Sequence, residues 1–183
     1  DDPVRYSDAP LVRTILAGHG LGCYMTCMVQ RRMILQGLWD VLVAGVPGDV
    51  VELGCNSGGT SILLARMLAA YRQKFTTSPR RELHLYDSFE GLPDQAEQDN
   101  KTKYYNKGQL KTNVWMVKQQ FARRGMLIPK IHSGFFGDIP DSEYPSQIAF
   151  AFFDSDFYQS IKDSFRKVFP KLAPGARVFV HDH

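Results

Sequence analysis

Ionisable side chains stand at the ends of four apolar runs in this sequence. Asp87, Asp154 and His181 each follow such a run directly, and Glu52 lies within the first of them. If the runs are parallel strands, their carboxyl ends share one edge of a sheet, and these side chains converge there. Carboxylates held close together repel one another, so a positive charge is expected among them. A sulfonium can supply it beside Glu52 and Asp87, and a divalent metal can supply it at the other end, beside Asp154 and Asp182.

The side chains at that second end leave the identity of the metal open. Carboxylate oxygens favour magnesium or calcium, whereas an imidazole among them shifts the preference towards manganese, iron or zinc. His181 brings such an imidazole, and whether it binds a metal stays open. An alternative is that Asp154 and Asp156 cap the following helix and that the terminal His-Asp-His is a frayed end. We expect Asp154 to bind the metal and Asp156 to cap the helix.

A glycine-rich turn follows the first apolar run at residues 54–60. Gly54 lets the chain turn sharply off a strand, and Gly58 lets a ligand approach the backbone. Hydroxyl side chains for the same ligand come from Ser57, Thr60 and Ser61. The G-x-x-x-G-G spacing departs from the G-x-G-x-x-G of dinucleotide sites, and Glu52 would repel a phosphate. The turn therefore favours a nucleoside ligand without phosphates, such as S-adenosylmethionine, over the alternative of an ordinary strand-turn-helix connection.

Two further stretches complete the expected cofactor site. Asp87 closes the second strand, where a carboxylate commonly holds the two hydroxyls of a ribose, and Ser88 follows it. Gly134 and Phe135 begin a loop at the same edge of the sheet. Aromatic side chains there can enclose an adenine, although they are at least as often part of an ordinary core.

Alternating strand and helix patterns predict an α/β protein with a mostly parallel, doubly wound Rossmann-like sheet and helices on both faces. The helices are expected at 25–44, 59–74, 108–124 and around 161–172, and the strands at 49–53, 82–87, 130–133, 148–153 and 177–180. Residues 88–107 are expected to form an excursion over the site. Residues 1–24, rich in glycine and proline, are expected to form an irregular leader or lid.

Composition excludes several classes of function. A net charge of +3 over 183 residues, without a long basic block, argues against a nucleic-acid partner. No apolar stretch reaches the length of a membrane span, and no signal peptide is evident. Three cysteines without paired spacing indicate neither a disulfide framework nor a zinc knuckle. We therefore expect a cytoplasmic protein that acts on a small molecule, with the oligomeric state open.

Four blocks of the sequence resemble the macrocin O-methyltransferase family of class I S-adenosylmethionine-dependent enzymes. They are VPGDVVELG at 46–54, YDSFEGLP at 86–93, DSDFYQS at 154–160 and PKLAPG at 170–175. The resemblance covers about residues 25–183 and implies methylation of hydroxyls on sugars and other natural-product scaffolds. Family members continue past the last strand into an antiparallel pair, so the methyltransferase domain expected at 25–183 either lacks the last two strands or is cut short of them.

The resemblance also implies roles for individual residues. Asp154 and Asp182 match acids understood to bind magnesium in the family, whereas His181 replaces a third acid, which brings manganese or iron into consideration. Asp154 is then both ligand and candidate base, and His181 is ligand or alternative base. Alternatives are a metal-dependent phenol or catechol O-methyltransferase and a catalytically degenerate cofactor-binding module. A nicotinamide oxidoreductase is disfavoured by the glycine spacing.

Overall fold

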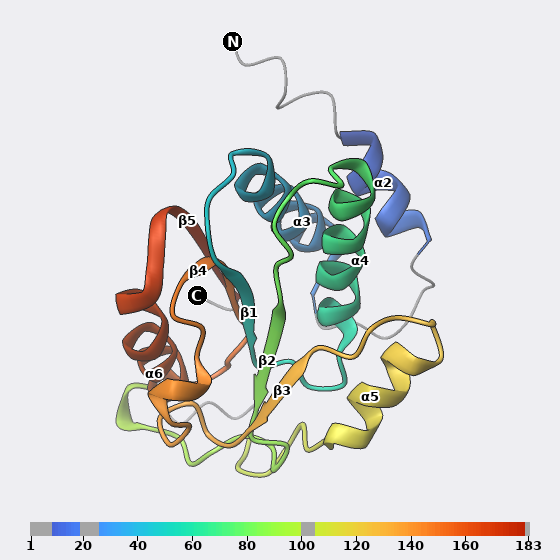
Figure 1. Cartoon of the computed structure of the whole chain (residues 1–183). Helices are drawn as coiled ribbons and strands as arrows, with labels where there is room; N and C mark the ends of the chain where they lie inside the picture. Colours follow the sequence, from blue (N-terminus) through green and yellow to red (C-terminus); the bar gives the residue numbers. More distant parts are fainter. Residues whose placement is uncertain (1–8, 19–25, 100–104, 182–183) are drawn as a thin grey trace.

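A computed structural model describes residues 9–18, 26–99 and 105–181 of the chain. Its described strands form one parallel five-stranded sheet in the order β3-β2-β1-β4-β5 (Figure 1). The strands are β1 (Asp49–Leu53), β2 (Leu83–Asp87), β3 (Lys130–Ser133), β4 (Ile148–Phe153) and β5 (Leu172–Val180). Because the strand order reverses between β1 and β4, this is a doubly wound sheet, as the sequence predicted.

Helices cover both faces of the sheet. The α-helices are α2 (Ala9–Ala17), α3 (Met28–Val43), α4 (Gly59–Lys74), α5 (Val114–Ala122) and α6 (Tyr158–Val168). Short 3-10 turns lie at Glu97–Asp99, Asp141–Glu143 and Phe169–Lys171. None of the helices in the described part of the chain is long and apolar enough to cross a membrane.

Two apolar clusters lie on opposite faces of the central strands. Val50 of β1 belongs to the cluster that also contains buried side chains of α3, α4 and α5, whereas Val51 and Leu53 belong to the other, together with Val168 of α6. Alternate side chains of a strand point to opposite faces, which explains this division. All six residues of β4 are buried, as its uninterrupted apolar run predicted.

The amino-terminal stretch corrects one expectation. Residues 9–17 form the helix α2, where the sequence had suggested irregular structure. Val12 and Ile15 lie three residues apart on one face of this helix and are buried in the cluster shared with α3 and α4. The glycines and prolines that suggested a loop lie mostly outside this helix. Residues 1–8 and 19–25 of the expected leader are outside the described structure.

Two elements begin at other residues than the sequence predicted. Helix α5 begins at Val114, not at 108, because Gly108 and Leu110 have positive φ angles and the Asn113 side chain caps the helix by accepting a hydrogen bond from the Met116 amide. Strand β5 begins at Leu172, not at 177. Its pairing with β4 shifts between Leu172 and Arg177, so the predicted Pro-Gly turn lies inside the strand as an irregularity of its register.

Candidate active site

The carboxyl ends of four strands are held together by backbone hydrogen bonds that continue just past the strands. The Gly54 amide donates to the Tyr86 carbonyl, the Asp154 amide to Leu53, and the His181 amide to Phe153, each at 2.8 Å. These bonds fix Gly54, Asp154 and His181 at one edge of the sheet. The predicted convergence at this edge is therefore present in the structure.

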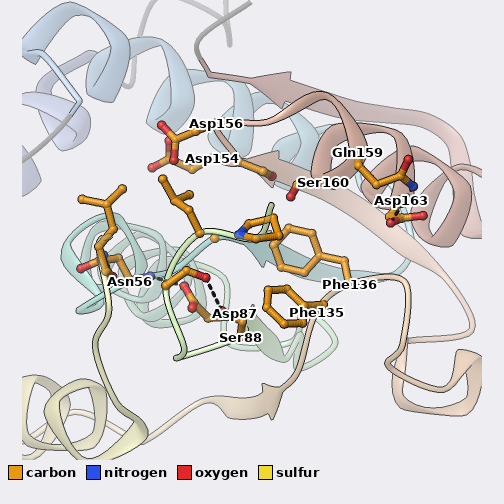
Figure 2. Close-up of a pocket in the computed structure, with 16 residues that line it drawn as sticks. Asn56, Asp87, Ser88, Phe135, Phe136, Asp154, Asp156, Gln159, Ser160 and Asp163 are labelled. Atoms are coloured by element: carbon orange, nitrogen blue, oxygen red, sulfur yellow. Dashed lines mark hydrogen bonds between the residues drawn. The ribbon is translucent and has the colours of Figure 1, made fainter. Parts of the chain in front are cut away.

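A cavity opens at this edge of the sheet (Figure 2). It is lined by the turn after β1, the loops after β2 and β3, and the start of α6. Of the residues proposed from sequence, Gly54, Asp87, Ser88, Phe135 and Asp154 line it. Gly134 lies just outside the lining, and its amide donates to the Asp87 carbonyl at 2.9 Å.

Asp87 occupies the floor of the cavity near the glycine-rich turn. Its two carboxylate oxygens accept hydrogen bonds from the backbone amides of Asn56 and Phe89, both at 2.8 Å. Burial raises the pKa of this carboxyl group, and the two amide donors oppose that effect. Each oxygen has a second lone-pair site, so Asp87 can accept further hydrogen bonds from a ligand.

Strained backbone gathers around Asp87. Among the described residues, the non-glycine residues with positive φ angles are Asn56 (46°), Phe89 (58°) and Leu110 (61°). Asn56 and Leu110 line the cavity, and the Asn56 side-chain amide donates to the Leu110 carbonyl at 3.1 Å. Such conformations persist only where the surroundings hold them, and they cluster at ligand-binding sites. The strain therefore supports a binding function for this end of the cavity.

Gly54 makes the closest approach between strand ends. A Cβ atom at this position would lie 1.9 Å from the Asp154 carbonyl oxygen, and φ is +95°. Only glycine fits both constraints. The sequence predicted a sharp turn here, but the contact with Asp154 emerges only when β1 and β4 are paired.

Glu52 does not face the cavity. Its side chain is 1% exposed and accepts a hydrogen bond from the Ser61 hydroxyl of α4 at 2.5 Å. Glu52 lies on the same side of β1 as Val50, and this side is covered by α4. Burial, reinforced by the charges of Asp154 and Asp87, raises the pKa of Glu52 to about 8. Glu52 is thus a buried group under α4, and its direct role in cofactor binding stays a prediction.

The remaining residues of the predicted turn also lie outside the cavity lining, namely Ser57, Gly58, Thr60 and Ser61. A Cβ atom on Gly58 would contact the side chains of Val117 and Phe121, so α5 packs over this part of the turn. A direct role of these four residues in cofactor binding stays a prediction.

At the other end of the cavity, Asp154 meets His181. The imidazole Nδ1 lies 2.8 Å from the Asp154 Oδ1, and His181 is 7% exposed. Asp154 lines the cavity and His181 stands behind it. A carboxylate oxygen and an imidazole nitrogen this close together form a donor set suited to a divalent cation that accepts mixed oxygen and nitrogen ligands.

No group of three metal-binding side chains is present among the described residues. Asp182, the expected third ligand, and His183 lie outside that part of the chain. The metal ligands proposed from sequence are therefore represented in the described structure by the Asp154–His181 pair.

Helix α6 contributes side chains that the sequence analysis did not include. Gln159, Ser160 and Asp163 line the cavity on the side of the Phe135–Phe136 loop (Figure 2). The Gln159 amide nitrogen donates to Asp163 Oδ2 at 3.0 Å. The spacing of residues 159, 160 and 163 on one helical face was the available signal. It could not be used because nothing in the sequence says which face of this helix meets the cavity.

Comparison with known proteins identifies a family. The family model described as Macrocin-O-methyltransferase (TylF) matches residues 20–183. One similar protein is the 8-demethyl-8-(2,3-dimethoxy-alpha-L-rhamnosyl)-tetracenomycin-C 4'-O-methyltransferase of Streptomyces olivaceus. It is 31% identical to this chain over 150 residues, which cover 78% of this chain and 56% of that protein. Mycinamicin III 3''-O-methyltransferase of Micromonospora griseorubida is 29% identical over 148 residues, covering 76% of this chain and 56% of its own length.

A solved structure shows the same fold. The O-methyltransferase NovP superposes with a TM-score of 0.74 and 27% sequence identity, covering 87% of this chain and 67% of that one. The present chain thus spans a little over half the length of the curated relatives that it matches.

Proposed function

Because this chain belongs to the macrocin-O-methyltransferase family, we propose that the protein transfers the methyl group of S-adenosylmethionine to a hydroxyl of a small molecule. The observation that carries the proposal is one cavity with Asp87 at one end and Asp154, backed by His181, at the other. The acceptor is a sugar hydroxyl or a hydroxyl of another natural-product scaffold. The rhamnosyl acceptor named for the Streptomyces olivaceus relative supports a sugar.

The Asp87 end of the cavity is the cofactor end. Asp87 can accept hydrogen bonds from the two hydroxyls of a ribose while it keeps the backbone bonds from Asn56 and Phe89. Leu92 and Phe135 offer apolar surface to the adenine in the same cavity. Gly54, which has no Cβ, lets the Asp154 carbonyl pack directly against the turn after β1.

The reaction is an in-line displacement at the methyl carbon. The acceptor oxygen forms the new carbon–oxygen bond as the carbon–sulfur bond breaks, and the bonding electrons leave with sulfur as the neutral thioether S-adenosylhomocysteine. The hydroxyl proton passes to the Asp154 carboxylate, because Asp154 lines the cavity whereas His181 lies behind it. His181, 2.8 Å away, orients that carboxylate. The cavity holds the methyl group and the acceptor oxygen in line, and this alignment accounts for much of the rate acceleration.

A divalent metal fits this end of the cavity, with Asp154 and His181 as the described residues that would hold it. When bound, such an ion would lower the pKa of the acceptor hydroxyl. We propose this metal dependence on the chemistry of the donor pair and expect magnesium or, because of the imidazole, manganese or iron.

Binding of the product S-adenosylhomocysteine tests the cofactor site. Calorimetry on the purified chain should show saturable binding that weakens at least about tenfold in Asp87→Asn, since a charge-assisted hydrogen bond contributes about 1.5–3 kcal/mol. Asp94→Asn is the matched control, because Asp94 is an exposed residue paired with Lys107. Thermal melts of both variants establish that they fold. Absence of binding by the unaltered chain would refute the proposal.

Metal dependence requires a separate experiment. Manganese titrated into the chain by calorimetry should bind, and His181→Ala should weaken that binding, whereas His181→Asp should shift the preference towards magnesium. Methyl transfer to a neutral deoxysugar glycoside should cease with chelator and return with the ion. Cofactor binding without transfer under any metal would identify a degenerate binding module.

A further inference from the structure

A second cavity lies between α4, α5 and the segments that lead into β2 and β3, and it shares no residue with the first. It is bounded by the carboxyl-terminal half of α4, the segment 78–83 leading into β2, and the connection 125–130 between α5 and β3. Figure 1 shows α4, α5 and this connection along one flank of the molecule. Its volume of about 800 Å³ is within the range of pockets that hold organic ligands.

The floor of this second cavity is apolar. Leu83 and Phe121 are buried there, and Leu68 and Met126 are partly buried beside them. The rim carries Leu127 and Ile128, of which Leu127 is 75% exposed. Contiguous exposed apolar surface of this kind marks a binding site more often than scattered single residues do. An apolar ligand body would therefore be desolvated on this floor.

Cations surround the apolar floor. Arg72, Arg80, Arg81 and Lys130 line the cavity, and the one acidic lining residue is Glu82, whose carboxylate lies 2.6 Å from the Lys130 ammonium. Within the described residues neither Arg72 nor Arg80 has a carboxylate within ion-pair distance. Arg81 donates from Nη1 to the Gly48 carbonyl, and its Nε is buried without a hydrogen-bond partner in the described structure.

Ordinary surface chemistry explains only part of this cluster. Arg72 lies in the last turn of α4, where a cation interacts favourably with the helix dipole. Arg80 and Arg81 follow the helix, where Arg80 attracts the Glu82 carboxylate and Arg81 the Asp49 carboxylate. Guanidinium groups beside an apolar surface suit a carboxylate or sulfonate attached to an apolar body, because they offer paired donors and are more weakly hydrated than an ammonium.

We propose that the second cavity binds an organic anion with an apolar body, such as a medium-chain or aromatic carboxylate, at a site separate from that of methyl transfer. The apolar floor holds the body, and Arg72 and Arg80 bind the anionic head. This inference does not depend on the reaction carried out at the other cavity.

Two fluorescent probes that differ by one charged group test the proposal. The anion 8-anilinonaphthalene-1-sulfonate should bind saturably and at least about tenfold more tightly than N-phenyl-1-naphthylamine, which lacks the sulfonate. The double variant Arg72→Gln/Arg80→Gln should lose most of this preference while it still binds the neutral probe. The matched control is Arg13→Gln/Arg32→Gln, which removes the same charge from α2 and α3 and should leave the preference unchanged.

Competition locates the probe. Decanoate should displace the sulfonate probe, and S-adenosylhomocysteine should not. Equal binding of the two probes, an equal loss in both double variants, or displacement by S-adenosylhomocysteine would each overturn the proposal.

Discussion

Raising the pH from 5 to 8 should destabilise the protein through the carboxyl group of Glu52. This group is buried near the carboxyl ends of the strands, and burial raises its pKa from 4.5 to about 8. In the unfolded chain the group ionises near its ordinary pKa, whereas in the folded protein it keeps its proton until about pH 8. Between these values the folded state therefore binds one more proton than the unfolded state, and its stability falls as the pH rises.

The size of this effect follows from the two pKa values. Each pH unit in the window costs about 1.4 kcal/mol, which amounts to about 5 kcal/mol between pH 4.5 and 8. The contribution becomes constant only about one unit above pH 8, where the group is ionised in both states. Glu52→Gln removes the titration and keeps an acceptor oxygen for the Ser61 hydroxyl. This variant should gain stability relative to the unaltered protein as the pH increases across the window.

Urea unfolding at pH 5, 6, 7 and 8 measures the difference. The free energy of unfolding of Glu52→Gln minus that of the unaltered chain should rise by about 1 kcal/mol per pH unit, most steeply between about pH 6 and 7. Titrating groups that do not interact with Glu52 cancel in this difference, whereas Asp87 and Asp154 are coupled to it. Glu97→Gln, at an exposed position, is the control substitution. A flat difference for Glu52→Gln would refute the reasoning, because Glu52 would then ionise in the folded protein as it does in water.

Two packing contacts around the cavity give further predictions. Gly54→Ala should lower the free energy of unfolding in urea by about 3–5 kcal/mol, because the residue has a positive φ and its Cβ would clash with the Asp154 carbonyl. Gly45→Ala should lower it by about 1 kcal/mol, because Gly45 also has a positive φ but lies in open space. Equal losses would contradict the role of the clash. Phe121→Ala should cost about 3–5 kcal/mol and weaken S-adenosylhomocysteine binding, because Phe121 is fully buried where α5 covers the glycine-rich turn. Trp115→Ala is the control, because Trp115 is 64% exposed on the same helix, and it should change the free energy of unfolding by less than about 0.5 kcal/mol. Unaltered S-adenosylhomocysteine binding in Phe121→Ala would show that the packing of Phe121 does not affect the cofactor site.

Local patterns in the sequence were sufficient to predict the order of strands and helices. The apolar run at β4 is buried along its whole length, and Val50–Leu53 of β1 are buried. In α3 the residues with helical spacing, Leu35, Leu38 and Leu42, are buried as well. Each signal lies within a few consecutive residues. The amphipathic helix α2 was missed because its short pattern stands among glycines and prolines that suggest a loop.

The candidate site was predicted in part. Parallel strands place their carboxyl ends at one edge, so the sequence could bring Asp87, Asp154 and His181 together without further information. It could not assign Gln159 or Asp163 to the cavity, because the exposed face of α6 depends on how that helix packs against β4. The direct contact between Gly54 and the Asp154 backbone likewise depends on strand pairing.

The sequence by itself determined the doubly wound sheet and the identity of the groups at its edge, because hydrophobic periodicity and the residues that end each strand are local properties. Tertiary structure alone decided which of those groups line the cavity. Glu52 and Asp87 both belong to strand ends, yet Asp87 lines the cavity while Glu52 points under α4 to Ser61. The direction of a side chain at a strand end depends on the register of the sheet and on the helix packed against that face, and both are set by contacts between segments distant in sequence.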